Sequence, residues 1–235
     1  GGKFAFGVSE NNFLGRGIEF TSDISVSEES LRGLISLNNP NYKGSNRSLN
    51  ASLESTVTDR LTNFGYKSNK TGFSVGSGFE FYDDLYWNTG ISSYIEKLDT
   101  DKTASASMKK QEGSYFDTFY NHTFSYDKRN QKYQASDGYI SRFTQNIPLI
   151  SESYALTNIY DYKIYNEWLD ENVFSIGFFG KTTNSLSGKD VKLSDRLYLP
   201  ANKLRGFESG KVGPQDGTDY IGGNYAATIN IATSL

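Results

Sequence analysis

The sequence predicts an all-β protein: an antiparallel, up-and-down transmembrane β-barrel. Three observations support this fold class. Apolar and polar residues alternate along most of the 235 residues, aromatic residues reach 15% although hydrophobic residues make up only 36%, and short and long connections alternate. A barrel with an aromatic-rich outer wall and a polar lumen has these properties, because lipid-facing and lumen-facing residues alternate along each strand.

Eleven segments show the period-two pattern of β-strands. Between residues 3 and 10, phenylalanine and valine occupy one face, and alanine, glycine and serine occupy the other. The second segment sets isoleucine, phenylalanine and valine against Glu19, Thr21 and Asp23. Residues 114–127 are so rich in aromatic side chains that their two faces are hard to separate. The expected strands cover residues 3–10, 18–26, 31–38, 49–57, 73–81, 85–96, 114–127, 139–147, 154–166, 173–181 and 227–231.

The connections between these strands fall into two kinds. Residues 11–17, 28–29, 39–44, 82–84 and 167–172 predict turns, whereas residues 59–70, 99–113 and 127–138 predict polar loops or linkers. We expect one end of the sheet to be tightly turned and the other to carry the long loops. Outer-membrane barrels show this asymmetry, with short periplasmic turns and longer external loops.

A soluble β-sandwich or a propeller fragment is the alternative, because alternation alone also describes an ordinary core. Two features favour the barrel. Aromatic residues gather near strand ends, as at Tyr42, Phe81, Tyr82, Tyr86, Tyr126 and Tyr133. The polar faces carry carboxylates throughout, as a water-filled lumen would: Glu19, Asp23, Glu54, Glu80 and Glu96.

Composition excludes several other classes. The net charge of −3 provides no basic surface for nucleic acid. The absence of cysteine rules out disulfides and thiolate metal sites. Mean hydropathy is −0.56, and no apolar run approaches the ~18 residues of a membrane-spanning helix.

The longest connection, about residues 181–222, is the candidate functional segment. Compact domains rarely keep an unstructured segment of this length unless it has a function. A cation, a glycine and an aromatic follow one another at Arg205, Gly206 and Phe207, which suits a loop tip that folds back into a polar cavity. The motif residues are Leu204, Arg205, Gly206, Phe207, Gly213 and Pro214.

Four stretches resemble the BamA-type assembly barrels of the Omp85 superfamily, the bacterial surface antigen D15-like proteins. Residues 12–17 are similar to the family's Asn-Phe/Trp-Leu-Gly-x-Gly turn, and residues 39–42 to its Asn/Asp-Pro-aromatic turn. Residues 126–138 follow its Asp-x-Arg to Pro-Thr-x-Gly segment, with Ala135 in place of the usual proline. Residues 204–214, followed by Gly-Gly-Asn at 222–224, resemble its Arg-Gly-Phe loop.

The resemblance implies that residues 1–235 form one partial barrel domain. It corresponds to about eleven of an expected sixteen strands, the second to the twelfth. The first strand, the last four strands and the periplasmic POTRA repeats are expected to lie outside this sequence. Two unpaired edges in lipid are costly, so we expect this polypeptide alone not to insert as a stable barrel.

In relatives the loop arginine is held by acidic side chains on strands at and beyond the Gly-Gly-Asn strand. Here that strand offers Thr228, Asn230 and Ala232, with no carboxylate. We therefore expect Arg205 to have weak or backbone partners, or to borrow a lumen acid such as Glu80 or Glu96.

The function implied is that of a non-enzymatic assembly factor, the core of a BAM-type complex, which inserts β-barrel proteins into the bacterial outer membrane. Its implied partners are the lipid bilayer and lipopolysaccharide, nascent outer-membrane proteins, and BAM-type lipoproteins bound through POTRA domains. No nucleic acid, metal or cofactor is implied. A two-partner secretion barrel, a porin-like channel and a surface adhesin remain alternatives.

Catalytic motifs have weaker support. Residues 72–76 match Gly-x-Ser-x-Gly, but that motif requires a strand–turn–helix and here lies inside an expected strand. His122 is the one histidine and is expected in a girdle or the lumen. Residues 216–219 match only part of a calcium loop, so we expect a solvated turn there.

Overall fold

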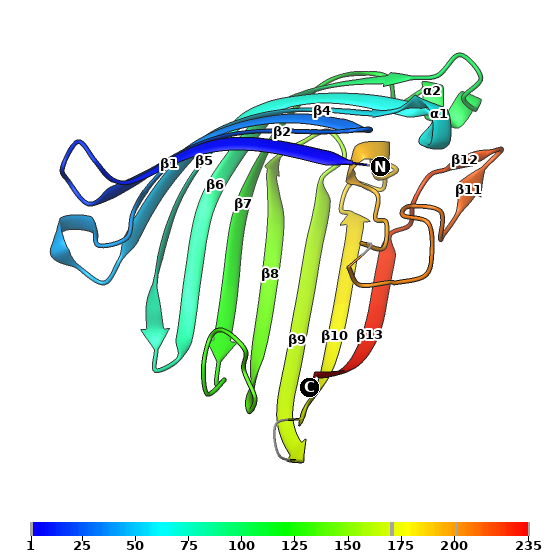
Figure 1. Ribbon diagram of the computed structural model, residues 1–235. Coiled ribbons are helices and arrows are strands. Elements are labelled where there is room, and N and C mark those ends of the chain that lie inside the picture. Colours follow the sequence, from blue (N-terminus) through cyan, green and yellow to red (C-terminus); the bar gives the residue numbers. More distant parts are fainter. Residues whose placement is uncertain (1, 170–171, 201, 235) are drawn as a thin grey trace.

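The computed structural model describes residues 2–169, 172–200 and 202–234. Eleven antiparallel strands form one sheet, and each strand pairs with the next along the chain. The sheet curves as part of a barrel wall (Figure 1). In order, the strands are β1 (Lys3–Phe13), β2 (Ile18–Ser27), β3 (Ser30–Asn39), β4 (Ser48–Arg60), β5 (Tyr66–Tyr82), β6 (Leu85–Thr100), β7 (Gly113–Asp127), β8 (Gly138–Ile150), β9 (Ala155–Leu169), β10 (Asn172–Ser185) and β13 (Tyr225–Ser234).

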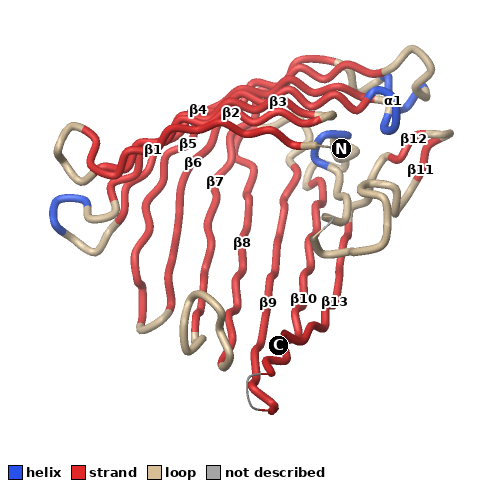
Figure 2. The backbone as a smooth tube through the Cα atoms, viewed as in Figure 1, coloured by secondary structure: helices blue, strands red, loops and turns tan. Residues whose placement is uncertain are grey.

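This architecture confirms the predicted fold class and strand number. β1 and β13 stand at the two ends of the strand order, so the eleven described strands form an open sheet. Other elements are small (Figure 2): the helices η1 (Tyr42–Gly44), α1 (Leu61–Phe64), α2 (Ala106–Lys109) and η2 (Leu193–Asp195), and a hairpin of β11 (Gln215–Asp216) and β12 (Asp219–Tyr220). Among the described residues, no helix is long and apolar enough to cross a membrane.

Alternation gives the sheet two chemically different faces. The outer face exposes large apolar side chains on almost every strand, including Phe6, Ile35, Leu53, Ile95 and Ile229. The opposite face, called the lumen face here, carries buried polar groups: Ser25, Ser68, Ser92, Glu96, Asp117, Ser175 and Thr183. An outer face of this kind suits lipid, and a polar inner face suits water or a polar segment of the protein.

The prediction of a loop at residues 59–70 is wrong for most of these residues. β4 continues to Arg60, α1 makes one turn, and β5 begins at Tyr66. Gly65 permits this tight connection, because its φ of 73° lies in the left-handed region. Both faces carry polar residues in this part of the hairpin, so the apolar half of the alternation is missing although the strand pairing continues.

The expected sorting of connections by length holds only in part. The loop end of the sheet is defined as the end with the β2–β3, β4–β5, β6–β7, β8–β9 and β10–β13 connections. It has the longest connection, residues 186–224, and also one of the two shortest described ones, residues 28–29, which equals the two-residue turn 83–84 at the opposite end. The opposite end has tight turns but also residues 128–137 between β7 and β8. Two positions of the expected 167–172 turn, 170 and 171, lie outside the described residues.

Candidate functional site

The long connection between β10 and β13 folds back over the lumen face. It covers residues 186–224, so it begins later than the predicted 181–222, because β10 continues to Ser185, and ends two residues later, because β13 begins at Tyr225. Within it, η2 inserts toward β6 and β7, and β11 pairs with β12. Leu197 and Gly223 form an isolated antiparallel bridge that closes the base of the loop. The described part of this segment, residues 186–200 and 202–224, is therefore an ordered loop, called the lumen loop below.

A buried ion centre fixes the lumen loop to the sheet. The ammonium of Lys192 lies 2.9 Å from Oε2 of Glu96 on β6 and 2.5 Å from Oδ2 of Asp117 on β7. Lys192, Glu96 and Asp117 are only 3%, 0% and 2% exposed. A third carboxylate, that of Asp195, lies 3.8 Å from the same nitrogen. Ser68 also donates a hydrogen bond to Glu96, at 2.6 Å.

Electrostatics keep Lys192 charged. Burial by itself lowers the pKa of Lys192, but the surrounding carboxylates, led by Asp195, outweigh burial and hold this pKa above its ordinary value. Burial raises the pKa of Asp195, and the Lys192 ammonium opposes that rise. Removing one partner from a buried ion pair leaves an uncompensated charge, which costs about 3–5 kcal/mol. The ion centre therefore couples loop position to sheet geometry strongly.

An apolar cluster supports the ion centre at the loop end of the sheet. Leu193 follows Lys192 directly, and its backbone N–H donates to Oε1 of Gln111 at 2.9 Å. The Leu193 side chain joins a buried cluster made by residues of β5, β6, α1 and the β6–β7 connection: Phe64, Tyr66, Leu98, Ala104 and Met108. Apolar burial here contributes roughly 1.5–3 kcal/mol for each large side chain.

Arginine and aromatic side chains extend this support toward the rest of the loop. The Arg60 guanidinium lies 5.0 Å from the ring centroid of Phe64 and 5.3 Å from that of Tyr198, which is in the loop. Phe64 and Tyr198 meet edge to face at 5.2 Å. Gly210 packs against Phe64 so closely that an added Cβ would lie 2.5 Å from the ring. Only glycine fits this position, where φ is 76°.

Two further contacts anchor the outer parts of the loop. Asp216 accepts hydrogen bonds from the hydroxyls of Ser105 at 2.5 Å and Ser107 at 2.9 Å. Lys203 forms an ion pair with Asp161 on β9 at 3.0 Å. The lumen loop is thus attached to β6, β7 and β9 at separate points.

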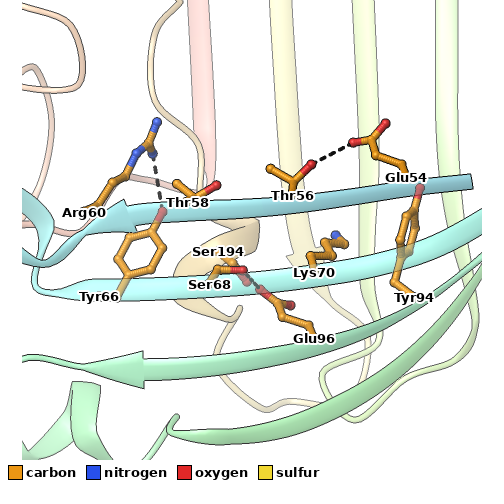
Figure 3. A pocket seen from close by; sticks show the side chains of 10 residues that line it. All are labelled: Glu54, Thr56, Thr58, Arg60, Tyr66, Ser68, Lys70, Tyr94, Glu96 and Ser194. Atoms are coloured by element: carbon orange, nitrogen blue, oxygen red, sulfur yellow. Dashed lines mark hydrogen bonds between the residues drawn. The ribbon is translucent and has the colours of Figure 1, made fainter. Parts of the chain in front are cut away.

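A polar cavity lies beside the ion centre (Figure 3). It has a volume of about 280 Å³. Lys70 lines it with its ammonium 4.4 Å from the ring centroid of Tyr94. The other lining residues, which come from β4, β5, β6 and η2, are almost all polar: Glu54, Thr56, Thr58, Arg60, Tyr66, Ser68, Glu96 and Ser194. Such a cavity suits water inside a lumen.

The predicted motif residues form none of the ion-centre contacts found among the described residues. Arg205, Gly206 and Phe207 are exposed, and Phe207 is 63% exposed. Gly206 has a φ of 84°. Among the described residues, Arg205 makes no ion pair or hydrogen bond. Leu204 is half-buried, and its N–H donates to the carbonyl of Pro200.

Gly213 and Pro214, the remaining motif residues, stand at the start of the β11–β12 hairpin. Gly213 has a φ of 138°, and the carbonyl of Pro214 accepts a hydrogen bond from Ile221 at 3.1 Å. They shape the return of the loop toward β13.

The suggested pairing of Arg205 with Glu80 or Glu96 is not formed. Glu96 is already occupied by Lys192 and Ser68. Glu80 accepts the Asp84 N–H at the opposite end of the sheet. Sequence reasoning missed Lys192, although a signal was present: a lysine between two apolar residues in an otherwise polar loop.

The weaker motifs have ordinary structural surroundings. Ser74 lies inside β5, and its hydroxyl is hydrogen-bonded to that of Ser52 at 2.6 Å. His122 lies on the outer face of β7, 2.9 Å from the side-chain oxygen of Gln145. Asp216 and Asp219 pair across the β11–β12 hairpin.

A curved sheet with an apolar outer face and a loop anchored on its lumen face defines a membrane-embedded β-barrel domain. The model of the Omp85 superfamily domain matches residues 12–234. The chain belongs to this superfamily, and its predicted likeness to BamA-type barrels is confirmed.

The chain is 22% identical over 245 residues to the human sorting and assembly machinery component 50 homolog, covering 100% of the chain and 51% of the human protein. Its bovine counterpart is 22% identical over 239 residues, with the same coverage. The crystal structure of BamA from Haemophilus ducreyi lacking POTRA domains 1–3 aligns with a TM-score of 0.84 and 20% identity, over 97% of this chain and 49% of that one. The chain therefore spans about half the length of these relatives.

Proposed function

We propose that this chain is the barrel portion of a factor that folds and inserts β-barrel proteins into an outer membrane. Membership of the Omp85 superfamily supports this role, as do relatives named sorting and assembly machinery components and a BamA fold. The observation that carries the proposal is the lumen loop, held on the sheet by Lys192 with Glu96 and Asp117. A loop fixed in this way would stabilise the lumen of a barrel whose wall opens during the insertion of another β-barrel protein.

The mechanism uses strand pairing and needs no catalytic residue. An incoming strand adds to an exposed sheet edge through main-chain hydrogen bonds, and side-chain alternation sets its register. A short apolar band thins the bilayer near that edge and lowers the barrier to insertion. While the incoming strand pairs with this edge, the lumen loop stabilises the curvature of the rest of the barrel wall.

The lumen loop disfavours a simple porin. A porin needs a continuous water-filled channel. Here residues 186–224 lie across the lumen face with buried ionic and apolar contacts. For a secretion barrel, by contrast, the loop would have to move aside while a passenger crosses.

The proposed setting is the bacterial outer membrane, with lipopolysaccharide as a lipid neighbour. Nascent outer-membrane proteins are the proposed substrates, and BAM-type lipoproteins are proposed to bind through POTRA domains of the whole protein. Because the relatives include human and bovine proteins, the alternative setting to examine is the outer membrane of an organelle in a eukaryotic cell.

Reconstitution of the full-length protein tests the proposed role. Purified protein in liposomes is given an unfolded small β-barrel client, and heat-modifiable migration of the client reports insertion. We expect client insertion above the protein-free rate and no steady ion conductance. Steady conductance without client insertion would instead indicate a channel, and export of a passenger from the liposomes would indicate secretion.

A further inference from the structure

A row of polar side chains crosses the outer face of the sheet. Cross-strand pairs place these residues in a single register line: Ser77 with Thr89, Thr89 with His122, His122 with Gln145, Gln145 with Asn158, Asn158 with Thr182, and Thr182 with Tyr225. It therefore runs over β5, β6, β7, β8, β9, β10 and β13, and we call it the polar row.

The polar row belongs to the lipid-facing side. Residues two positions along the same strands include Ile91, Phe143 and Tyr160, which are among the exposed large hydrophobic side chains. The lumen-facing ion centre, with Glu96 and Asp117, occupies positions of opposite parity on β6 and β7. A polar line thus crosses a face that also exposes large apolar and aromatic side chains.

Side-chain hydrogen bonds link four members of the row in series: His122, Gln145, Asn158 and Thr182. The His122 ring nitrogen lies 2.9 Å from Oε1 of Gln145, and Nε2 of Gln145 donates to Oδ1 of Asn158 at 2.7 Å. Nδ2 of Asn158 then donates to the hydroxyl of Thr182 at 3.3 Å. Thr89, also in the row, donates instead to the hydroxyl of Tyr120, a residue of β7 beside the row, at 2.7 Å.

After these hydrogen bonds are formed, some amide N–H groups of the row still have no acceptor among the described residues. A side-chain amide has two N–H groups, and in the described part of the protein Gln145 and Asn158 each donate one bond along the row. Hydrocarbon cannot accept the second N–H, and an unmet polar group in the bilayer is expensive.

A girdle at the membrane surface does not explain the row. Register lines run perpendicular to the strands, and membrane strands tilt by about 35–45°. Seven strands about 4.8 Å apart give a line of roughly 29 Å, which climbs about 17–20 Å through an apolar band of about 25 Å. His122 and Gln145, well inside β7 and β8, therefore lie within the hydrocarbon region.

Barrel geometry indicates what fits such a line. Two barrels of the same handedness that meet side by side present strands crossing at about 70–90°, because each tilts by about 35–45° in its own wall. The strands of a neighbouring barrel consequently run within about 20° of the polar row. Three steps of the row, about 14 Å, also match two outward side-chain steps of a strand, about 13 Å.

We propose that the polar row is a lateral docking line for an outward-facing strand of a second transmembrane β-barrel. That strand would present hydroxyl or amide side chains at alternate positions, and these groups would satisfy the free donors of Gln145 and Asn158. Row-to-row pairing of two copies is disfavoured, because two facing rows cross steeply and touch at one point. The inference depends on the membrane-embedded fold and not on the proposed assembly role.

Photo-crosslinking in the full-length protein in its native membrane tests this. A photoreactive phenylalanine derivative replaces Tyr160, beside the row, or Leu53, an exposed outer-face residue on β4 away from it. We expect the Tyr160 position to capture an outward-facing strand peptide of another β-barrel, identified by mass spectrometry, and the Leu53 position to capture only lipid. Capture of a second copy of this chain through such a strand also supports the proposal.

A second variant tests whether capture depends on the polar side chains of the row. Gln145→Leu/Asn158→Leu removes the free donors and is expected to reduce capture at Tyr160 roughly tenfold. Heat-modifiable migration verifies its folding, and the single variant Asn158→Leu serves if the double variant does not fold. Lipid adducts alone at both positions, or undiminished capture by the folded leucine variant, would overturn the proposal. Client insertion measured in parallel separates this outcome from failure of the assembly role.

Discussion

Lys192 and Asp117 stand 75 positions apart in the sequence, yet the ammonium of one lies 2.5 Å from the carboxylate of the other. Both are buried, and Oδ1 of Asp117 has no hydrogen-bond partner among the described atoms. The contact joins the lumen loop to the middle of the sheet. Several measurable properties of the lumen loop, such as its stability and its resistance to proteolysis, depend on this contact.

Loss of the Lys192 charge should release the lumen loop. Lys192→Met keeps an apolar stem but leaves Glu96 and Asp117 uncompensated, so we expect about 3–5 kcal/mol of destabilisation. Chemical unfolding of the full-length protein in detergent measures it, and limited proteolysis within residues 186–224 reports release of the loop. Lys211→Met is the control, because Lys211 pairs with Glu208 at an exposed site and should change stability by about 0–1 kcal/mol. Equal effects of the two variants would contradict the role of the ion centre.

Gly210 should tolerate no side chain, whereas Gly206 should. Both have positive φ, 76° and 84°, so alanine at either site meets backbone strain of about 1 kcal/mol. Only at Gly210 does an added Cβ collide with Phe64; at Gly206 nothing lies within 4 Å. Gly210→Ala should therefore increase proteolysis of the loop well beyond Gly206→Ala. Indistinguishable cleavage rates would show that the Phe64 contact does not hold the loop.

Acid should loosen the hairpin of the lumen loop through Asp216. Hydrogen bonds from the hydroxyls of Ser105 and Ser107 lower the pKa of Asp216 below its ordinary 3.8. A lowered folded-state pKa contributes stability above pH 3.8, and this stability is lost as the pH falls through the folded value. Pepsin cleavage near residues 204–207 should thus be faster at about pH 2 than at about pH 4.

The variant Asp216→Asn isolates that contribution. Burial raises the pKa of Asp195 above its ordinary 3.8, so its protonation stabilises the folded state as the pH falls, and this effect lies mainly above pH 3.8, whereas that of Asp216 lies below it. An asparagine side chain does not titrate, so the variant should lose the Asp216 part of the pH dependence. A variant with the same pH dependence as the natural sequence would exclude Asp216 as its source.

Arg205 should matter for function and not for stability. Its side chain is exposed and has no partner among the described residues, so Arg205→Ala should change the free energy of unfolding by less than about 0.5 kcal/mol. If the motif acts in client assembly, the same variant should slow client insertion by the full-length protein. Lys203→Ala, which removes the Lys203–Asp161 pair, controls for a general effect of losing a loop cation. Normal insertion by Arg205→Ala would remove this residue from the mechanism.

Strand number and pairing were predictable because alternation is local information. The face on which a residue such as Ile95 lies can be predicted from the apolar residues at every second position around it. Consecutive strands pair in order, so the pairing follows from the strand order. Alternation does not identify the strands at residues 59–70, where both faces of the hairpin are polar. Connection length separates the two ends of the sheet less strictly than the sequence predicts, because short and long connections occur at both ends.

The ion centre was beyond this kind of reasoning. Lys192, Glu96 and Asp117 come from three separate segments, and only the fold brings them together. Asp117 lies in the aromatic-rich strand whose faces could not be distinguished from the sequence. The lack of a carboxylate on the matching face of β13 can be read from the sequence, but nothing in the sequence indicated that Glu96 was already paired.

A charge exchange measures whether the buried Lys192–Glu96 pair governs activity. Client insertion is measured with full-length Lys192→Glu, Glu96→Lys and the double variant Lys192→Glu/Glu96→Lys, each verified for folding by heat-modifiable migration. If the buried pair holds the lumen loop in its working position, each single variant should lose most activity and the double variant should recover a substantial part of it. Full activity in Lys192→Glu, or a double variant no better than the worse single variant, would show that this pair does not hold the lumen loop in its working position.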